Sequence, residues 1–179
     1  MGCPRSAARV HTGVVSAQDV DPAGPAAPLP GRAPHAVDST PRLSLPPALQ
    51  TWLRDRSGQA VALALLDVVD LRGVNSAEGH DVGDRVLSDV AVRLRLAQPE
   101  GPVVRWQGDM FIVGRPAGDV GSRVRLGDVC REATVGLETP GGRRVLVSVG
   151  SSAGLSAELV LAAADRERHR HRNTLMAGA

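Results

Sequence analysis

Residues 60–66 form an unbroken apolar run that constrains the fold more than any other segment. The run reads Ala-Val-Ala-Leu-Ala-Leu-Leu, has the length of one strand, and lies between Gly58 and Asp67. A strand with two apolar faces has to be covered on both sides, since otherwise one of those faces would meet water. The sequence therefore predicts a central, doubly covered strand that ends at an acidic residue.

Helical and strand patterns alternate after this run. A polar loop that contains Gly73 and Gly79 is expected first, and apolar residues then recur at helical spacing over residues 82–97. Two short β-rich segments, 103–106 and 110–113, predict a tight hairpin through Gln107-Gly108-Asp109. The other expected elements are a helix at 48–53, a helix at 120–133, a hairpin of 134–138 and 143–149, and a helix at 157–172.

This order of elements predicts an α+β sandwich, in which helices flank a central, mostly antiparallel sheet. If the first strand and the first hairpin are neighbours, Asp67 and Asp109 meet at one end of the sheet. Two carboxylates in that position are candidate ligands for Mg²⁺, which prefers one or two carboxylates together with phosphate oxygens.

Proline divides the chain into two parts. Nine of the 13 prolines fall within the first 50 residues, a stretch with few large apolar side chains. Because proline disfavours both helix and sheet, we expect residues 1–45 to be a disordered, Pro-rich extension and residues 46–179 to be the folded domain. A Pro-rich ligand for an aromatic groove is the alternative, but no clean PxxP motif with flanking basic residues supports it.

Composition excludes several classes of protein. The 21 basic residues, all arginine, nearly balance 19 acidic residues, which argues against a nucleic-acid partner. No run of 18 apolar residues is present, so no membrane partner is expected. Cys3 and Cys130 form neither a disulfide framework nor a zinc site. Residues 1–11 have no apolar leader segment, so a cytoplasmic location is expected.

Two segments together resemble a known family. Residues 67–87 read Asp-Val-Val-Asp-Leu-Arg-Gly-Val-Asn-Ser-Ala-Glu-Gly-His-Asp-Val-Gly-Asp-Arg-Val-Leu, and residues 105–111 read Arg-Trp-Gln-Gly-Asp-Met-Phe. The first resembles, without gaps, the signature D-x-D-x-F-K-x-I-N-D-x-x-G-H-x-x-G-D-x-x-L of the GGDEF (diguanylate cyclase) family, and the second resembles its R-x-G-G-D-E-F motif. Ser148-Val-Gly150 and Ala164-Asp165 resemble its S-I-G strand and the start of its last helix.

The resemblance implies a fold related to nucleotidyl cyclases and polymerase palms, and the synthesis of cyclic di-GMP from two GTP molecules by a dimer. It also implies roles for individual residues. Asp67, Asp109 and the Val68 carbonyl would bind Mg²⁺, with Asp109 in the catalytic position. The expected nucleotide contacts are Asn75 and Asp84 on guanine, and the main chain of Leu71, Arg72 and Gly73 with the Arg172 side chain on phosphates. Gly79 and Gly83 would permit a turn and close helix packing.

Several residues depart from the family pattern. Gln107 replaces the first glycine of the motif, and Met110 replaces its glutamate. A thioether carries no charge, so if that glutamate helps to activate the attacking hydroxyl, its loss costs about 3–5 kcal/mol of barrier. The other departures are Val69, Ser76 and Leu71 in the first signature, and Glu167, His169 and Arg172 where the last helix has Ala, Tyr and Lys.

The product-inhibition motif R-x-x-D of the family is also missing. Gln98 and Gly101 stand in its place, so feedback binding of cyclic di-GMP is not expected. Outside the motifs, we interpret residues 166–172 as a solvated basic helix end rather than a nucleic-acid contact. His80, Trp52 and Trp106 are interpreted as packing or capping residues.

The leading hypothesis is a degenerate GGDEF domain, catalytically weak or inactive. It would act as a GTP- or nucleotide-responsive module in cyclic di-GMP signalling, as a homodimer or a heterodimer with another signalling protein. An active diguanylate cyclase that uses Mg²⁺ is the first alternative. A structural, partner-binding domain without nucleotide is the second.

Overall fold

The computed structural model describes residues 45–119 and 121–178, all within one unit, Arg42–Ala179. The predicted Pro-rich extension lies outside the described residues except for Leu45. The elements in chain order are α1 (Pro47–Arg54), β1 (Val61–Val69), α2 (Leu71–Glu78), α3 (His80–Ala97), β2 (Val103–Trp106), β3 (Met110–Pro116), α4 (Ser122–Thr134), β4 (Leu137–Glu138), β5 (Arg144–Gly154) and α5 (Ala157–Ala177).

The five strands form one antiparallel sheet in the order β2-β3-β1-β5-β4. β1 is central and all nine of its residues are buried, which confirms the doubly covered strand. The strand does not end at Asp67, however, but continues to Val69. Asp67 is therefore inside the ladder, opposite Met110 of β3 and Ser148 of β5.

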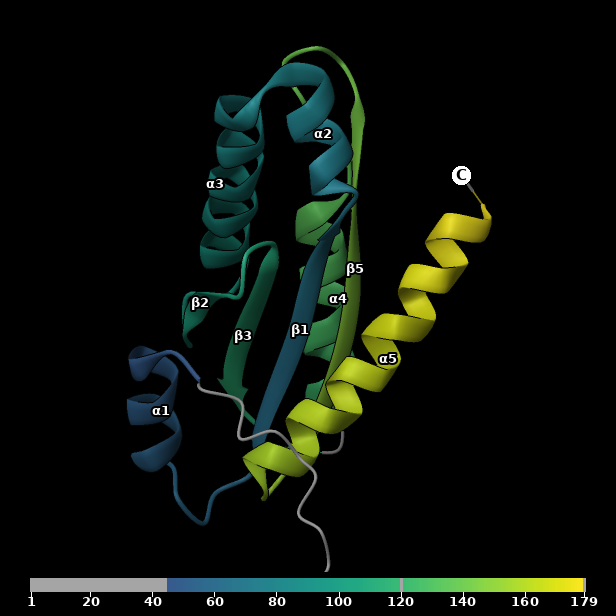
Figure 1. The fold of residues 1–179 in the computed structure, drawn as a ribbon. Coiled ribbons are helices and arrows are strands. Elements are labelled where there is room, and N and C mark those ends of the chain that lie inside the picture. The colour runs from purple at the N-terminus through teal and green to yellow at the C-terminus, as the bar shows by residue number, and fades with distance from the viewer. Residues whose placement is uncertain (1–44, 120, 179) are drawn as a thin grey trace, which may run out of the picture. The chain divides into compact units, whose positions relative to one another are not determined.

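Helices cover both faces of the sheet, as expected for an α+β sandwich (Figure 1). On one face, α3 and α4 pack against side chains such as Leu66 and Val68. On the other, α1 and α5 pack against Leu63 and Leu65. Because successive residues of a strand point to opposite faces, Asp67 lies on the α5 face.

The predicted polar loop before α3 is wrong: most of it is the helix α2. Asp70 caps this helix in a left-handed conformation (φ 59°), and its carboxylate accepts a hydrogen bond from the Gly73 amide at 3.1 Å. A Cβ on Gly73 would overlap that carboxylate, so the glycine serves the cap and does not mark a loop. Gly79 (φ 95°) then makes the turn from α2 to α3.

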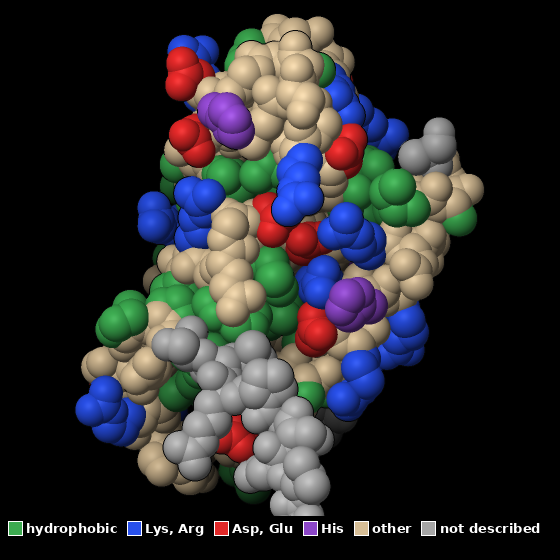
Figure 2. All heavy atoms as spheres, viewed as in Figure 1, with side chains coloured by type: hydrophobic (Ala, Val, Ile, Leu, Met, Phe, Trp, Pro, Cys, Tyr) green, Lys and Arg blue, Asp and Glu red, His purple; other side chains and the backbone are tan. Residues whose placement is uncertain are grey.

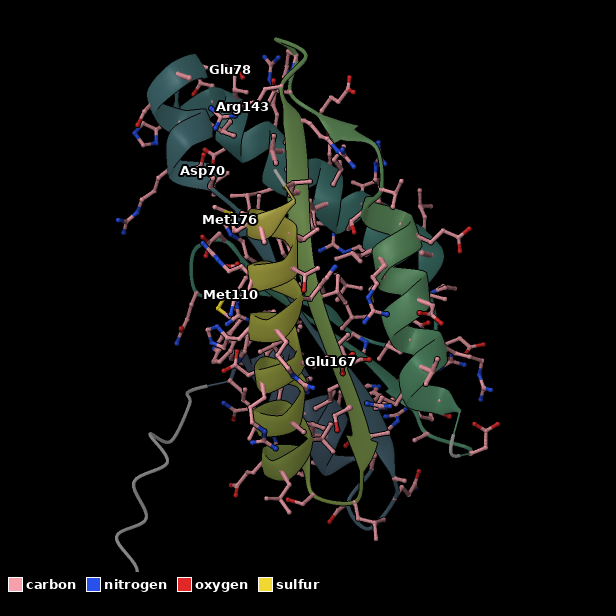
Figure 3. All side chains as sticks on the ribbon, turned by 90° about the vertical axis from the view of Figure 1, so that its right-hand side faces the viewer. Asp70, Glu78, Met110, Arg143, Glu167 and Met176 are labelled. Atoms are coloured by element: carbon pink, nitrogen blue, oxygen red, sulfur yellow. The ribbon has the colours of Figure 1, made fainter. Side chains whose placement is uncertain are left out.

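Both ends of α2 are bound to the turn between β4 and β5. At the first end, Arg143 forms an ion pair with Asp70 at 2.6 Å. At the second, Glu78 accepts hydrogen bonds from the Thr139 hydroxyl at 2.9 Å and the Gly141 amide at 3.3 Å. Figure 3 shows Arg143 close to Asp70, with Glu78 near the far end of the same helix. These contacts fix the position of α2 on the sheet.

The remaining elements differ from prediction mainly in their bounds. The first hairpin is confirmed, and β3 runs three residues further than expected. In the second hairpin, β4 is shorter than expected, with two residues, whereas β5 is longer and continues to Gly154. The last helix extends to Ala177, since neither proline nor glycine interrupts it before Gly178.

Two predicted absences can be examined in this part of the chain. Among the described residues, no helix is both long and apolar enough to cross a membrane. Cys130 is buried in α4, and burial raises the pKa of its thiol to about 12. This cysteine therefore packs as a neutral, unreactive side chain.

Candidate functional site

A pocket of about 370 Å³ lies between α2, the start of α3 and the turn from β2 to β3. Its lining includes Arg72 and Asn75 of α2, Asp84 of α3, and Arg105 and Asp109 of the hairpin. Two separate segments of the chain, within residues 71–87 and 105–109, thus meet in one cavity. The predicted nucleotide residues Leu71, Arg72, Asn75 and Asp84 and the predicted catalytic residue Asp109 all line it.

The acceptor groups of this pocket come from Asn75 and Asp84. The Oδ1 atom of Asn75 is buried, and no described residue gives it a hydrogen bond. It lies against Gly83, where a Cβ would overlap it, so Gly83 lets α3 approach α2 as predicted. An amide oxygen beside a carboxylate suits a ligand edge with adjacent N–H donors, as guanine has at N1 and N2.

The donor groups come from Arg72 and Arg105, both exposed. The Nε of Arg105 donates to the Gly108 carbonyl at 2.7 Å, which holds the hairpin turn beside the pocket. Neither arginine has a carboxylate partner in the part of the chain that the structure describes. The Gly73 amide, by contrast, is already bound by Asp70, so the predicted main-chain phosphate site is partly occupied.

Asp67 is in a different environment. The residue is 5% exposed, and its Oδ2 atom is contacted by three groups. Arg172 forms a short ion pair with it, an Arg168 Nη1 lies at 3.5 Å, and the Ser148 hydroxyl lies at 3.4 Å. Arginines of α5 therefore balance the negative charge of this carboxylate. Figure 2 shows acidic and basic side chains interleaved in the middle of this face of the molecule.

Asp67 and Asp109 lie at the same end of the sheet but have different surroundings. The Val68 amide donates to the Asp109 carbonyl at 3.1 Å, which brings the hairpin turn beside the end of β1 as predicted. Asp67 nevertheless faces α5, whereas Asp109 lines the pocket with α2 and α3. Within the described ranges, no group of three or more His, Cys, Asp or Glu side chains could hold a metal ion. Mg²⁺ can use one or two protein carboxylates together with phosphate oxygens, but Asp67, one of the two expected here, is already paired with two arginines of α5, so this set does not fit the ion.

The two changed positions of the second motif differ in what they do. Met110 is half-buried, lies opposite Asp67, and packs against the apolar cluster on the α5 face (Figure 3). Gln107 begins the hairpin turn with φ 49°, in the left-handed region that glycine adopts without strain. A side chain there costs about 1–2 kcal/mol.

The interpretation of residues 166–172 as a solvated basic helix end is wrong for part of the run. Arg168 is 6% exposed, and Glu167 forms ion pairs with Arg131 of α4 at 3.1 Å and with Arg123 at 3.6 Å. A signal was present in the sequence, because the buried stripe of Leu161 and Ala164 continues at helical spacing to position 168.

His171 also faces inward from α5. Its Nδ1 accepts a hydrogen bond from the Val149 amide at 2.9 Å. Burial, assisted by the positive charge of Arg131, holds the pKa of this imidazole below its usual value of 6.5. The backbone hydrogen bond and Glu167 act in the opposite direction but do not cancel that effect.

The remaining predictions concern the two tryptophans, His80 and the position of the missing inhibition motif. Trp106 is buried and Trp52 packs under Arg56, whose guanidinium carbon lies 4.4 Å from the ring centre, whereas His80 lines the pocket. At the site of the missing inhibition motif, Gln98 is buried, and a Cβ on Gly101 would overlap the Gly114 carbonyl. Arg105 and Arg168 are the functional candidates that sequence reasoning missed.

Comparison with protein families gives one match: the model "Diguanylate cyclase, GGDEF domain" covers residues 42–172. Among solved structures, the diguanylate cyclase SiaD from Pseudomonas aeruginosa, in complex with its activator SiaC, is similar at 27% identity and a TM-score of 0.60. That alignment covers 70% of this chain and 54% of the other, so this chain spans about half of that protein.

Two further structures show the same fold. A sensory box/GGDEF family protein from Caulobacter crescentus has 28% identity and a TM-score of 0.55, with 71% of this chain and 87% of that chain covered. The active GGEEF domain of a diguanylate cyclase from Vibrio cholerae has 18% identity and a TM-score of 0.59, with coverages of 71% and 84%. A search of curated proteins found no match.

Proposed function

Since the chain belongs to the GGDEF family of cyclic di-GMP signalling, we propose that it is a guanine-nucleotide-binding domain with weak or no cyclase activity. Its role would be to regulate or bind another signalling protein in response to GTP. The single observation that carries the proposal is the pocket that Asn75 and Asp84 both line, with a buried Asn75 Oδ1 that has no hydrogen-bond partner among the described residues.

Guanine recognition follows from the chemistry of these acceptors. Asp84 and Asn75 would accept hydrogen bonds from N1–H and the N2 amino group of guanine, whereas adenine has no donor at N1. A buried acceptor without a partner is unfavourable, so a ligand that supplies the donor gains affinity. Arg72 and Arg105 would receive the phosphates, because guanidinium groups form charge-assisted hydrogen bonds to phosphate oxygens.

The proposed loss of cyclase activity follows from the residues on the α5 side of the same sheet end. Cyclisation needs a group that activates the attacking hydroxyl and positive charge that stabilises the phosphate. Met110 supplies no acid or base, and it packs against the apolar cluster beneath α5. Asp109 alone keeps a carboxylate at the hairpin turn, and its catalytic role remains part of the proposal.

Calorimetric titration with GTP and ATP tests nucleotide binding. We expect GTP to bind more tightly than ATP, and the Asp84→Ala and Asn75→Ala variants each to lose about 1–3 kcal/mol of binding free energy. Asp89→Ala is the matched control, because Asp89 is exposed on the same helix but does not line the pocket. No heat and no thermal shift with any nucleotide would favour the structural, partner-binding alternative.

Incubation with GTP and Mg²⁺ or Mn²⁺, the ions that GGDEF cyclases generally use, tests the active-cyclase alternative. We expect little or no cyclic di-GMP by chromatography, and none for Asp109→Ala. Met110→Glu should also form little or no cyclic di-GMP, because the Asp67 carboxylate opposite this position is already paired with an arginine of α5. Clear turnover that Asp109→Ala abolishes would establish an active enzyme.

The proposed partner is a second copy of the chain or another signalling protein. The SiaD structure contains an activator protein, which supports a partner-dependent role for a GGDEF chain. Size-exclusion chromatography with and without GTP would measure the change of assembly on nucleotide binding. The cytoplasmic location and the absence of nucleic-acid and membrane partners stay predictions of the sequence.

A further inference from the structure

The Asp67 carboxylate, which aligns with a metal ligand of the family signature, is bound by the chain itself. Three groups converge on one oxygen, Oδ2: the guanidinium groups of Arg172 and Arg168 and the hydroxyl of Ser148. Asp67 is 5% exposed, and two of the three groups that surround its Oδ2 atom are positive charges from α5.

Arg168 has a second carboxylate partner, Asp165, which holds its guanidinium group beside Asp67. Its Nε and Nη2 atoms donate to one oxygen of Asp165, at 3.0 and 2.7 Å. A Cβ on Gly150 of β5 would overlap the backbone of α5 at Arg168, so this glycine lets the helix lie directly against the strand. Arginine also stays protonated at any physiological pH, so the positive charge is permanent.

The charges of this cluster balance without an ion. Two carboxylates, of Asp67 and Asp165, face two guanidinium groups, of Arg168 and Arg172. A divalent cation at Asp67 would lie next to both guanidinium groups and be repelled by them. The neighbouring side chain across the ladder is the Met110 thioether, which a hard cation such as Mg²⁺ does not favour.

We infer that this chain binds guanine nucleotides without a divalent cation, because the Arg168–Asp67–Arg172 ion pairs occupy the metal position. The inference rests on the proposed function, guanine-nucleotide binding. The phosphate charge is met by Arg72 and Arg105 at the pocket. Arg172, which the sequence assigns to phosphate, is instead the partner of Asp67.

A pair of nucleotide titrations tests the inference on the intact chain. GTP is titrated once with excess Mg²⁺ and once with EDTA, and the dissociation constants are compared. We expect the two values to agree within about twofold, and a value about tenfold or more tighter with Mg²⁺ would overturn the inference. If GTP binds in neither condition, the proposed function is refuted, and the Mn²⁺ experiment described next tests the metal position.

Mn²⁺ alone, followed by the electron paramagnetic resonance signal of the free ion, tests the metal position without nucleotide. We expect the wild-type chain to take up no Mn²⁺ at this site. The Arg168→Leu/Arg172→Gln double variant should take up Mn²⁺, and adding Asp67→Asn should abolish that uptake. Arg170→Gln is the matched control, since the one partner of this exposed arginine of α5 within the described residues is the Arg166 carbonyl, at 3.3 Å.

The outcomes of the second experiment separate the two proposals. Uptake of Mn²⁺ by the wild-type chain that disappears in Asp67→Asn would overturn the inference, whether or not GTP binds. No uptake by the folded double variant would also contradict it, because the arginines would then not be what excludes the ion. The fold of each variant is checked by circular dichroism, and the wild-type titrations decide the inference if the double variant does not fold.

Discussion

The two sides of this sheet end have kept different parts of the family pattern. On the α2–α3 side, Asn75, Gly83 and Asp84 match the signature and line one pocket. On the α5 side, Met110 and Arg172 replace residues of the pattern and lie next to Asp67. The matching residues and the changed residues thus lie on different elements, and the proposed function follows from this division: guanine binding would be kept and cyclase activity lost.

A physical reason distinguishes the two sides. The pocket side depends on backbone geometry: Gly79 turns the chain from α2 to α3, and Gly83 lets the two helices approach. The α5 side depends on charge, and an isolated buried carboxylate such as Asp67 can be satisfied either by an ion or by arginines of the same chain. A substitution on that side can preserve the fold while it removes the chemistry.

Neutralising each of the two acids gives the largest expected difference between the sides. Asp67→Asn should lower the free energy of unfolding by about 2–4 kcal/mol, because buried Arg168 loses one of its two carboxylate partners. Asp109→Asn should change it by less than about 0.5 kcal/mol, since Asp109 is half-buried at a hairpin turn and forms no ion pair within the described residues. Urea denaturation measures both.

Stabilisation of the chain by Asp67→Asn would instead support a metal site. Two acids arranged for an absent cation repel each other, so neutralising either one would stabilise the chain. If Asp67→Asn raises the urea midpoint at an unchanged slope, the comparison between the sides fails.

Gly83→Ala tests the pocket side. The new methyl group would overlap Asn75 Oδ1 and force α2 and α3 apart, so we expect a loss of about 1–3 kcal/mol of stability together with weaker GTP binding. Gly118→Ala is the matched control, because a Cβ there meets no atom within 4 Å. Unchanged GTP binding in Gly83→Ala would show that Asn75 does not contribute to the pocket.

Sequence reasoning succeeded where a pattern reports a local requirement. The apolar run of residues 60–66 predicted the central strand, and the Gln107-Gly108-Asp109 turn predicted the hairpin beside it. The same reasoning missed α2, because two glycines suggested a loop. Asp70 caps the helix there, and its own left-handed conformation could not be read from residue type.

The site was harder to predict because its partners are distant in the sequence. Asn75, Asp84 and Asp109 came from the family signature, and they do line one pocket. The pairing of Asp67 with Arg168 joins residues 101 positions apart, since 168 − 67 = 101. Each looked ordinary alone: an acid near the end of a strand and an arginine in a basic run. Only the packing of α5 on the sheet brings them together.

Glu78→Gln tests whether the pocket depends on the clamp that holds α2. The carboxylate accepts from the Thr139 hydroxyl and the Gly141 amide, and the amide variant keeps its size but weakens both bonds. We expect a loss of about 1 kcal/mol of stability and a smaller loss of GTP affinity. Glu138→Gln, at an exposed position of β4, is the control. Equal effects of the two variants in urea denaturation would contradict a role for the clamp.

The smallest expected effect is a dependence of the free energy of unfolding on pH that arises from His171 of α5. Burial holds the pKa of His171 below 6.5, so the unfolded chain takes up a proton near pH 6.5 before the folded chain does. The free energy of unfolding should therefore fall as the pH is lowered from 6.5 toward the folded pKa, and His171→Asn should reduce this fall. Urea midpoints measured at several pH values check this prediction. If His171→Asn follows the wild-type curve, the prediction is contradicted, because His171 then does not take up the destabilising proton.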